Sequence, residues 1–149
     1  MSSTHVQINR LEDVQLFQQL IDDWCKAWCT LPGQDQPNWE MIRSFYADTE
    51  GLIFYDAVTP HSFSNVEEMQ SAFPPVAQLR LTPRNDLRVY RTGDSVWTTI
   101  TQDIEAVGKD DSPFQMTQRQ TAIWQFHGDR SVVLHEHLSS KSSLLKGIH

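Results

Sequence analysis

The sequence has few residues that could form cross-links or metal centres. Its 149 residues include only two cysteines, Cys25 and Cys29. Both fall on an expected helix, where two cysteines one turn apart have poor geometry for a disulfide. No further Cys or His stands near them at a metal-site spacing, and no glycine-rich phosphate loop occurs. We therefore expect two reduced thiols, no metal and no cofactor.

Cationic residues are also scarce. The chain has 12 Lys and Arg against 19 Asp and Glu, a formal net charge of −7, and no Lys/Arg-rich run. Nucleic acids and anionic membrane surfaces are bound through clustered cations, so neither is an expected partner. No apolar run approaches the roughly 20 residues of a membrane-spanning helix. Residues 1–5 lack the basic and apolar regions of a signal peptide, and we expect a cytoplasmic protein.

The composition is nevertheless that of a globular domain. Five Trp and seven Phe supply bulk for a core, and 39% of the residues are hydrophobic. A chain of this length forms one ordinary domain. We expect a single domain over residues 1–149, with an ordered core at about 10–139 and a polar tail at 140–149.

Three helices are predicted in the first half of the chain. The first covers about residues 10–30, with Asn9 as its N-cap, because apolar residues recur there at spacings of three and four. A second covers about 39–47 behind the cap Asn38. A third follows a capping box that begins at Ser64.

Strands dominate the second half. Alternation, β-branched residues and glycine turns predict four strands in hairpin sequence after a short early strand that ends at Asp56. The predicted class is α+β, with a strongly curved, mostly antiparallel sheet wrapped around the long first helix into a cone-shaped barrel. A ligand pocket is expected between that helix and the sheet. The expected strands are 52–55, 79–91, 95–107, 114–126 and 132–139.

The last strand has polar residues on both faces. Alternation places Glu136 with Leu138 on one face, and Val133, His135 and His137 on the other. Such a strand is not a plain core strand. We expect one face to line a cavity and the other to meet a partner or solvent.

Several segments together resemble the SnoaL-like superfamily, which includes ketosteroid isomerase, polyketide cyclases, nuclear transport factor two and the association domain of calcium/calmodulin-dependent kinase. The resemblance spans about residues 11–139 and is nearest to the kinase-association and uncharacterised SnoaL-like branches. It implies the cone-shaped α+β fold and a dimer or larger assembly, but it does not fix a function, because one fold serves many chemistries. The matching segments are 54–56, 93–97, 119–124 and 135–139.

Functional residues of the relatives carry over unevenly. Asp56 lies where the isomerase keeps its general base. The isomerase's oxyanion-hole tyrosine falls near Trp24 and its protonated carboxylate near Ala122, so its pair of donors is not reproduced. The resemblance places pocket arginines of the kinase-association domain near Gln102, Ala122 and Leu138, where this chain has no arginine.

Two carboxylates are the candidate catalytic groups. Asp56 is either a base at the pocket mouth or a strand-end carboxylate bound by loop amides. Glu136 is either buried, with Gln120 as a partner on the neighbouring strand, or an edge residue that reaches solvent. The aromatic and amide residues expected to wall the pocket are Trp24, Trp28, Phe54, Trp97, Gln120 and Trp124.

The opposite face of the last strand is expected to form a homodimer interface. Thr121, His135 and His137 would lie there beneath a second subunit. Two His on one strand face also raise the hypothesis of a metal site, but no third ligand is evident.

Two functions remain open at this stage. One is a cofactor-independent isomerase, cyclase or dehydratase that acts on a small apolar molecule by proton transfer, with Asp56 as base. The other is a non-catalytic module for ligand binding or oligomer assembly.

Overall fold

The structure is a computed structural model that describes residues 5–48, 51–56, 61–127 and 130–142. Of residues 53–56, 61, 127, 141 and 142 it gives the backbone alone. The helices are α1 (Leu11–Trp28), α2 (Trp39–Ser44) and α3 (Val66–Ala72). The strands are β1 (Gln7–Ile8), β2 (Ile53–Asp56), β3 (His61–Phe63), β4 (Val76–Pro83), β5 (Arg88–Thr92), β6 (Ser95–Gly108), β7 (Pro113–His127) and β8 (Arg130–Ser142).

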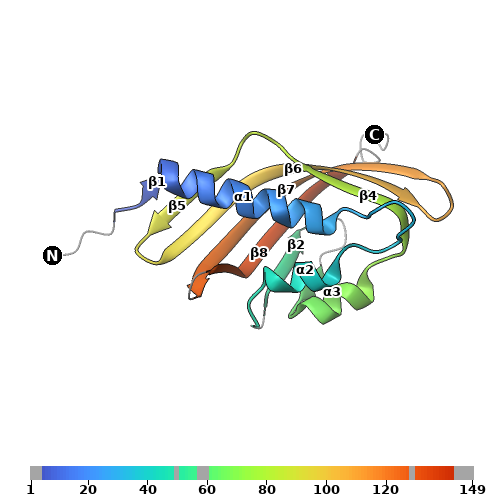
Figure 1. Cartoon of the computed structure of the whole chain (residues 1–149), viewed down its shortest axis with the longest axis horizontal. Helices are drawn as coiled ribbons and strands as arrows, with labels where there is room; N and C mark the ends of the chain where they lie inside the picture. The colour runs from blue at the N-terminus through green and yellow to red at the C-terminus, as the bar shows by residue number, and fades with distance from the viewer. Residues whose placement is uncertain (1–4, 49–50, 57–60, 128–129, 143–149) are drawn as a thin grey trace.

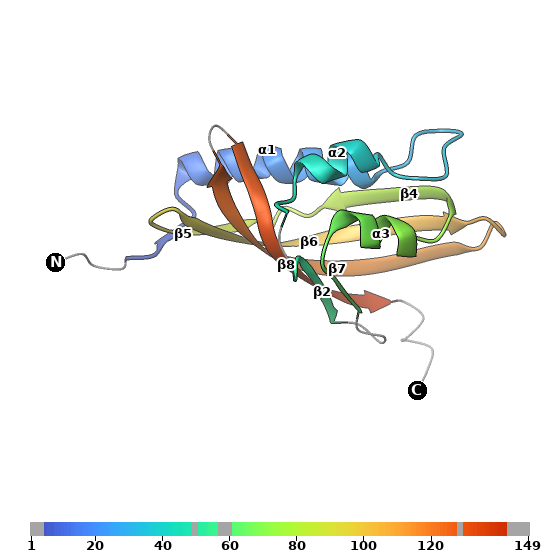
Figure 2. The ribbon, with the colours of Figure 1, turned by 90° about the horizontal axis from the view of Figure 1, so that it is seen from below.

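One curved sheet and the long helix α1 make up most of the described structure. The strand order is β1-β5-β6-β7-β8-β2-β3, and β4 pairs with the part of β6 that β5 leaves free. All pairs are antiparallel except β2 with β8. Figure 1 shows α1 lying across one face of the sheet, and Figure 2 shows α1 and α2 on the same side of the β6–β7 layer. The predicted α+β class and curved sheet are confirmed, although the sheet stays open at both edges.

The strand predictions need three corrections. β4 and β5 are both neighbours of β6, so the four strands do not follow a simple hairpin order. The expected loop at 57–63 contains β3, which pairs with β2, while residues 57–60 lie outside the described part. β8 continues to Ser142, because residues 140–142 pair with β7; the expected tail therefore begins too early.

Two helix starts also differ from the prediction. Asn9 does not cap α1: its φ is 54°, and its Oδ1 accepts the backbone N–H of Val89 at 2.9 Å. The cap of α3 is Asn65 rather than Ser64, with Asn65 accepting the N–H of Glu68 and the Glu68 carboxylate accepting that of Ser64. A capping box is thus present, one residue later than expected. Asn38 caps α2 as predicted.

A β-bulge corrects the predicted alternation of β8. Ile123 is opposite His135, but Trp124 is opposite Val133, so Leu134 is an extra residue in the ladder. Val133 is therefore fully buried on the inner face rather than on the face of His135. Beyond the bulge the predicted alternation holds.

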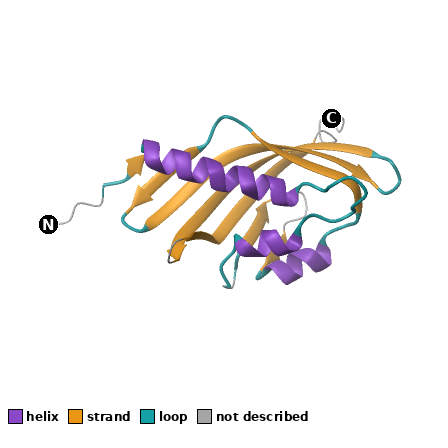
Figure 3. Cartoon of the chain, viewed as in Figure 1, coloured by secondary structure: helices purple, strands orange, loops and turns teal. Residues whose placement is uncertain are grey.

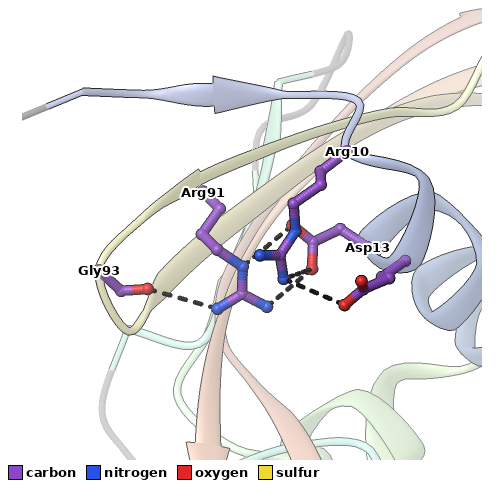
Figure 4. Close-up of polar contacts among 5 residues, drawn as sticks. Arg10, Asp13, Arg91 and Gly93 are labelled. Atoms are coloured by element: carbon purple, nitrogen blue, oxygen red, sulfur yellow. Dashed lines mark hydrogen bonds and ion pairs between the residues drawn. The ribbon is translucent and has the colours of Figure 1, made fainter.

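The N-terminal half of α1 is fastened to β5 by a buried carboxylate. Asp13 is 3% exposed and accepts two bonds from Arg91, at 2.9 and 3.0 Å, and one from Arg10 at 3.2 Å (Figure 4). Arg91 also donates to the carbonyl of Gly93 and lies over the ring of Phe126. The bonds from Arg91, aided by Arg10, hold the pKa of Asp13 below its usual value against the opposing effect of burial. The cluster ties the helix to the sheet.

The three helices gather on one side of the sheet (Figure 3), and the core lies between them. Near the start of α1, Phe17 packs edge-to-face on Trp124. Near its end, Trp28 contacts the rings of Trp24, Trp39 and Phe73. The aromatic stripe predicted from helical spacing is thus core at one end of α1 and, as described next, pocket wall at the other.

Candidate functional site

A pocket opens between the C-terminal half of α1 and the concave face of the sheet. Its volume is about 420 Å³. None of the described residues that line it is charged, and most are apolar. The lining residues are Trp24, Trp28, Phe73, Pro74, Pro75, Val76, Leu79, Leu81, Ile104, Ala106, Gly108, Ser112, Phe114, Met116, Gln118 and Leu138.

Polar groups reach this pocket at few points. Trp24 Nε1 donates to the Tyr46 hydroxyl at 2.9 Å, and the Ser112 hydroxyl donates to Asp110. Trp28 is only 7% exposed, and its Nε1 has no hydrogen-bond partner among the described residues. Gln118 supplies the other buried polar side chain of the lining. The wall is thus suited to an uncharged molecule that offers few polar atoms.

Glu136 lies behind this wall and is completely buried. Its carboxylate accepts the Tyr46 hydroxyl at 3.1 Å from each oxygen, and the Gln120 Nε2 donates to Oε1 at 3.1 Å. No cation contacts it among the described residues. Burial raises the pKa of Glu136 to about 7, although the bonds from Gln120 and Tyr46 oppose the rise. A buried acid with this pKa can exist in either protonation state near neutral pH.

Three glutamines connect Glu136 to the pocket. Gln118 Nε2 donates to Gln102 Oε1 at 2.7 Å, and Gln102 Nε2 donates to Gln120 Oε1 at 3.0 Å. Gln120 then donates to Glu136. All three amides are buried. We call the row Gln118–Gln102–Gln120 the amide row.

The carboxylate therefore meets the pocket wall along two routes. One passes through the amide row and ends at Gln118. The other passes through Tyr46 and ends at Trp24. Because both end residues line the pocket, a molecule bound there would contact both ends of the network that holds Glu136.

The predicted site residues are only partly brought together. Trp24 and Trp28 line the pocket. Gln120 is the partner of Glu136, as predicted, but stands behind the lining. Trp124 is buried against Phe17 and donates to Thr98, so it belongs to the core beside the pocket rather than to its wall.

Trp97, which was expected in the pocket wall, does not line the pocket. It stacks on Tyr90 with ring centroids 5.2 Å apart, on the face of the sheet opposite the pocket, while its neighbour Thr98 points inward. β6 alternates without a bulge here, so the inward position of Thr98 forces Trp97 outward. The side chains of Phe54 and Asp56 lie outside the described part, although β2 places the backbone of Asp56 opposite Ser139.

The residues expected at a dimer interface share the outer face. Thr121 is exposed, and His135 and His137 are half-buried. His135 Nδ1 donates to the carbonyl of Gly51 at 2.6 Å. Ile123, opposite His135, is 42% exposed.

Sequence reasoning missed the amide row. Gln102 and Gln118 were not assigned a role. A usable pattern was present, since Gln118 and Gln120 are two apart on one strand and so share a face. The contribution of Gln102 depends on the β6–β7 register, in which it is opposite Gln118.

The described residues contain no group of three or more His, Cys, Asp or Glu arranged to hold a metal ion. No helix among them is long and apolar enough to cross a membrane. Cys25 and Cys29 are free thiols, as predicted, and burial raises the pKa of Cys25 to about 12, so this thiol is unreactive at neutral pH.

This combination of a curved open sheet, a long helix across it and a pocket between them is the nuclear transport factor 2-like fold. The resemblance to the SnoaL-like superfamily is thereby confirmed for the fold. No protein-family model matches the sequence, and no curated protein matches it. The fold is recognised through its similarity to solved structures.

Three of these illustrate the range. A Novosphingobium aromaticivorans protein provisionally named an aromatic ring hydroxylase has a TM-score of 0.70 at 14% identity, over 91% of this chain and 96% of that one. An NTF2-like protein of unknown function from Pseudomonas putida KT2440 has a TM-score of 0.57 at 22% identity, over 87% of each chain. The association domain of C. elegans CaMKII has a TM-score of 0.56 at 14% identity, over 86% of this chain and 92% of that one. At these identities the likeness establishes the fold alone.

Proposed function

We propose that this single-domain protein binds a small, neutral, largely apolar molecule in the pocket between α1 and the sheet. The observation that supports this most directly is the wall of the pocket, in which none of the described lining residues is charged and most are apolar.

A pocket-filling variant tests this proposal. Ala106→Trp would project an indole into the pocket, whereas Ala77→Trp, on an exposed position of β4, would not. Using 2-naphthol as a probe and calorimetry as the readout, we expect saturable binding to the wild type and to Ala77→Trp, and none to Ala106→Trp. Equal binding to all three proteins, or no binding to the wild type, would contradict the proposal.

We further propose a cofactor-independent proton transfer on the bound molecule, as in an isomerase, cyclase or dehydratase. Asp56 would be the base, and Glu136 would orient the molecule through the amide row. A carboxylic acid that can change protonation state near neutral pH supports this class of reaction. Once mass spectrometry has identified what co-purifies, Asp56→Asn should lower turnover by about 10²–10⁴-fold. A change confined to affinity would instead assign the protein to the binding modules.

We also propose a homodimer that packs through the outer face of the sheet. The stacked pair Tyr90 and Trp97 and the exposed Ile123 give that face an apolar centre beside Thr121 and His135. The named association domain among the similar structures is consistent with assembly through this fold. Ile123→Asp should convert a dimer to a monomer in light scattering at tens of micromolar. A wild-type monomer under those conditions would refute the interface.

A further inference from the structure

The amide row has a direction. When Glu136 is ionised, its carboxylate only accepts hydrogen bonds, so Gln120 then turns its Nε2 toward Glu136, as the structure shows. Its Oε1 is then on the far side and receives the Nε2 of Gln102, whose Oε1 in turn receives the Nε2 of Gln118. Each amide is oriented by the one before it. Glu136 thereby determines which atom of Gln118 is left over.

The atom left over is an acceptor. With its Nε2 committed to Gln102, Gln118 has its Oε1 remaining, and this oxygen accepts no bond among the described residues. Gln118 is 4% exposed and lines the pocket. The pocket therefore contains one oxygen that needs a donor.

A second buried group requires the opposite partner. Trp28 Nε1 is a donor only, and it is unpartnered among the described residues. The other polar side chains of the lining are engaged: Trp24 donates to Tyr46, and Ser112 donates to Asp110. Because the Trp28 Nε1 atom itself is buried, it is not accessible to a molecule in the pocket. The wall thus offers one vacant polar atom among the described residues, the acceptor Gln118 Oε1.

We propose that the molecule bound in this pocket is a neutral, apolar alcohol or phenol, whose hydroxyl donates to Gln118 Oε1. A hydroxyl supplies the donor that this oxygen lacks without adding a charge. None of the described lining residues is charged, which disfavours a carboxylate, phosphate or ammonium. This inference rests on the proposed small-molecule function and adds the chemical class of the ligand.

Three probes of similar shape separate the effect of a hydrogen-bond donor on affinity from that of an acceptor. Naphthalene has neither group, 2-methoxynaphthalene only accepts, and 2-naphthol both donates and accepts. At pH 7.5 we expect 2-naphthol to bind more tightly than either of the other two probes. The step from 2-methoxynaphthalene to 2-naphthol should be about 2- to 12-fold, the range of one net hydrogen bond.

Variants assign the step to Gln118. Gln118→Met keeps the side-chain length and removes the amide, so 2-naphthol should lose its advantage over 2-methoxynaphthalene. Gln125→Met, on an exposed position of the same strand, should keep that advantage. Gln102→Leu would free the Gln118 amide to turn, which should weaken 2-naphthol and strengthen 2-methoxynaphthalene.

The outcomes distinguish the two levels of the proposal. If none of the probes binds the wild type, the proposed small-molecule function fails. If all bind but 2-naphthol has no advantage, or keeps its advantage in Gln118→Met, the pocket is confirmed and the hydroxyl assignment is overturned. The wild-type comparison stands even if a variant does not fold.

Discussion

Two buried carboxylates, Asp13 on α1 and Glu136 on β8, are held in opposite ways. Asp13 is 3% exposed and is paired with two arginines, which keep its pKa below the usual value. Glu136 is fully buried, and the groups that contact it, Gln120 and Tyr46, are uncharged. Its pKa rises to about 7. The carboxylate of Asp13 is thus held in its charged form, whereas that of Glu136 is near the midpoint of its titration at neutral pH.

The difference follows from the groups that surround each carboxylate. A carboxylate between guanidinium groups stays charged throughout the neutral range and ties α1 to β5. When only neutral donors stabilise a buried carboxylate, its ionisation costs free energy in the folded protein. Its pKa therefore rises, and it can take up or release a proton near neutral pH. Perturbed acids of this kind beside a pocket are typical of functional sites.

The largest expected effect comes from breaking the paired carboxylate. Arg91→Met removes the main partner of Asp13 and leaves a buried charge with Arg10 alone, which should lower the free energy of unfolding by about 3–5 kcal/mol. Urea denaturation measures the change. Arg84→Met is the matched control, since its pair with Asp103 is about half exposed and its loss should change the stability little. Equal losses in the two variants would deny Asp13 its structural role.

The second prediction uses the opposite pH responses of the two acids. Because the folded-state pKa of Glu136 is raised from 4.5 to about 7, the stability due to its protonated form is fully present below about pH 4.5 and is lost as the pH rises to about 7. At about 1.4 kcal/mol per pKa unit, this loss is about 3 kcal/mol. The contribution of Asp13 has the other sign, since its pKa is lowered and its stabilisation disappears as the medium becomes acidic.

Glu136→Gln isolates the first of these contributions. Its free energy of unfolding minus that of the wild type should increase by about 3 kcal/mol between pH 4.5 and pH 8, because only the wild type must ionise a buried acid. Urea denaturation at a series of pH values gives this difference. A difference that does not change with pH would mean that Glu136 titrates normally.

The smallest expected effect tests the second route to Glu136. Tyr46→Phe deletes the hydroxyl that accepts from Trp24 and donates to Glu136. The Trp24 Nε1 and the Glu136 carboxylate then each lack one hydrogen bond, which should lower the free energy of unfolding by about 1–3 kcal/mol. Tyr90→Phe on the outer face should change the stability by less than about 0.5 kcal/mol. A similar effect of the two variants would show that the Tyr46 hydroxyl is not coupled to the network.

Local patterns were sufficient to predict much of the fold. Helical spacing predicted α1 and its apolar stripe, and the pairing of Gln120 with Glu136 followed from two neighbouring strands. The position of Trp97 could not be obtained in this way, because it depends on which face of β6 the pocket occupies. The inward face of Val133 depends on a bulge, which leaves no mark in the local sequence.

The amide row shows the same limit of prediction from local sequence patterns. Gln118 and Gln120 share a face by alternation alone, but only the register between β6 and β7 places Gln102 opposite Gln118. Tyr46 reaches Glu136 from a segment 90 residues earlier in the chain. Contacts of this range are set by tertiary packing, so sequence spacing cannot predict them.

The bulge at Leu134 has a consequence for a different part of the molecule. On its near side, Val133 exchanges backbone hydrogen bonds with Phe45 and Ala47, which flank Tyr46. On its far side, Glu136 donates its N–H to the carbonyl of Leu52 and opens the pairing with β2. A deletion of Leu134 would leave every side chain of β8 on its present face, yet it would shorten the span between these two anchor points. The inserted Leu134 therefore acts as a spacer that sets the position of the Tyr46 hydroxyl relative to the Glu136 carboxylate.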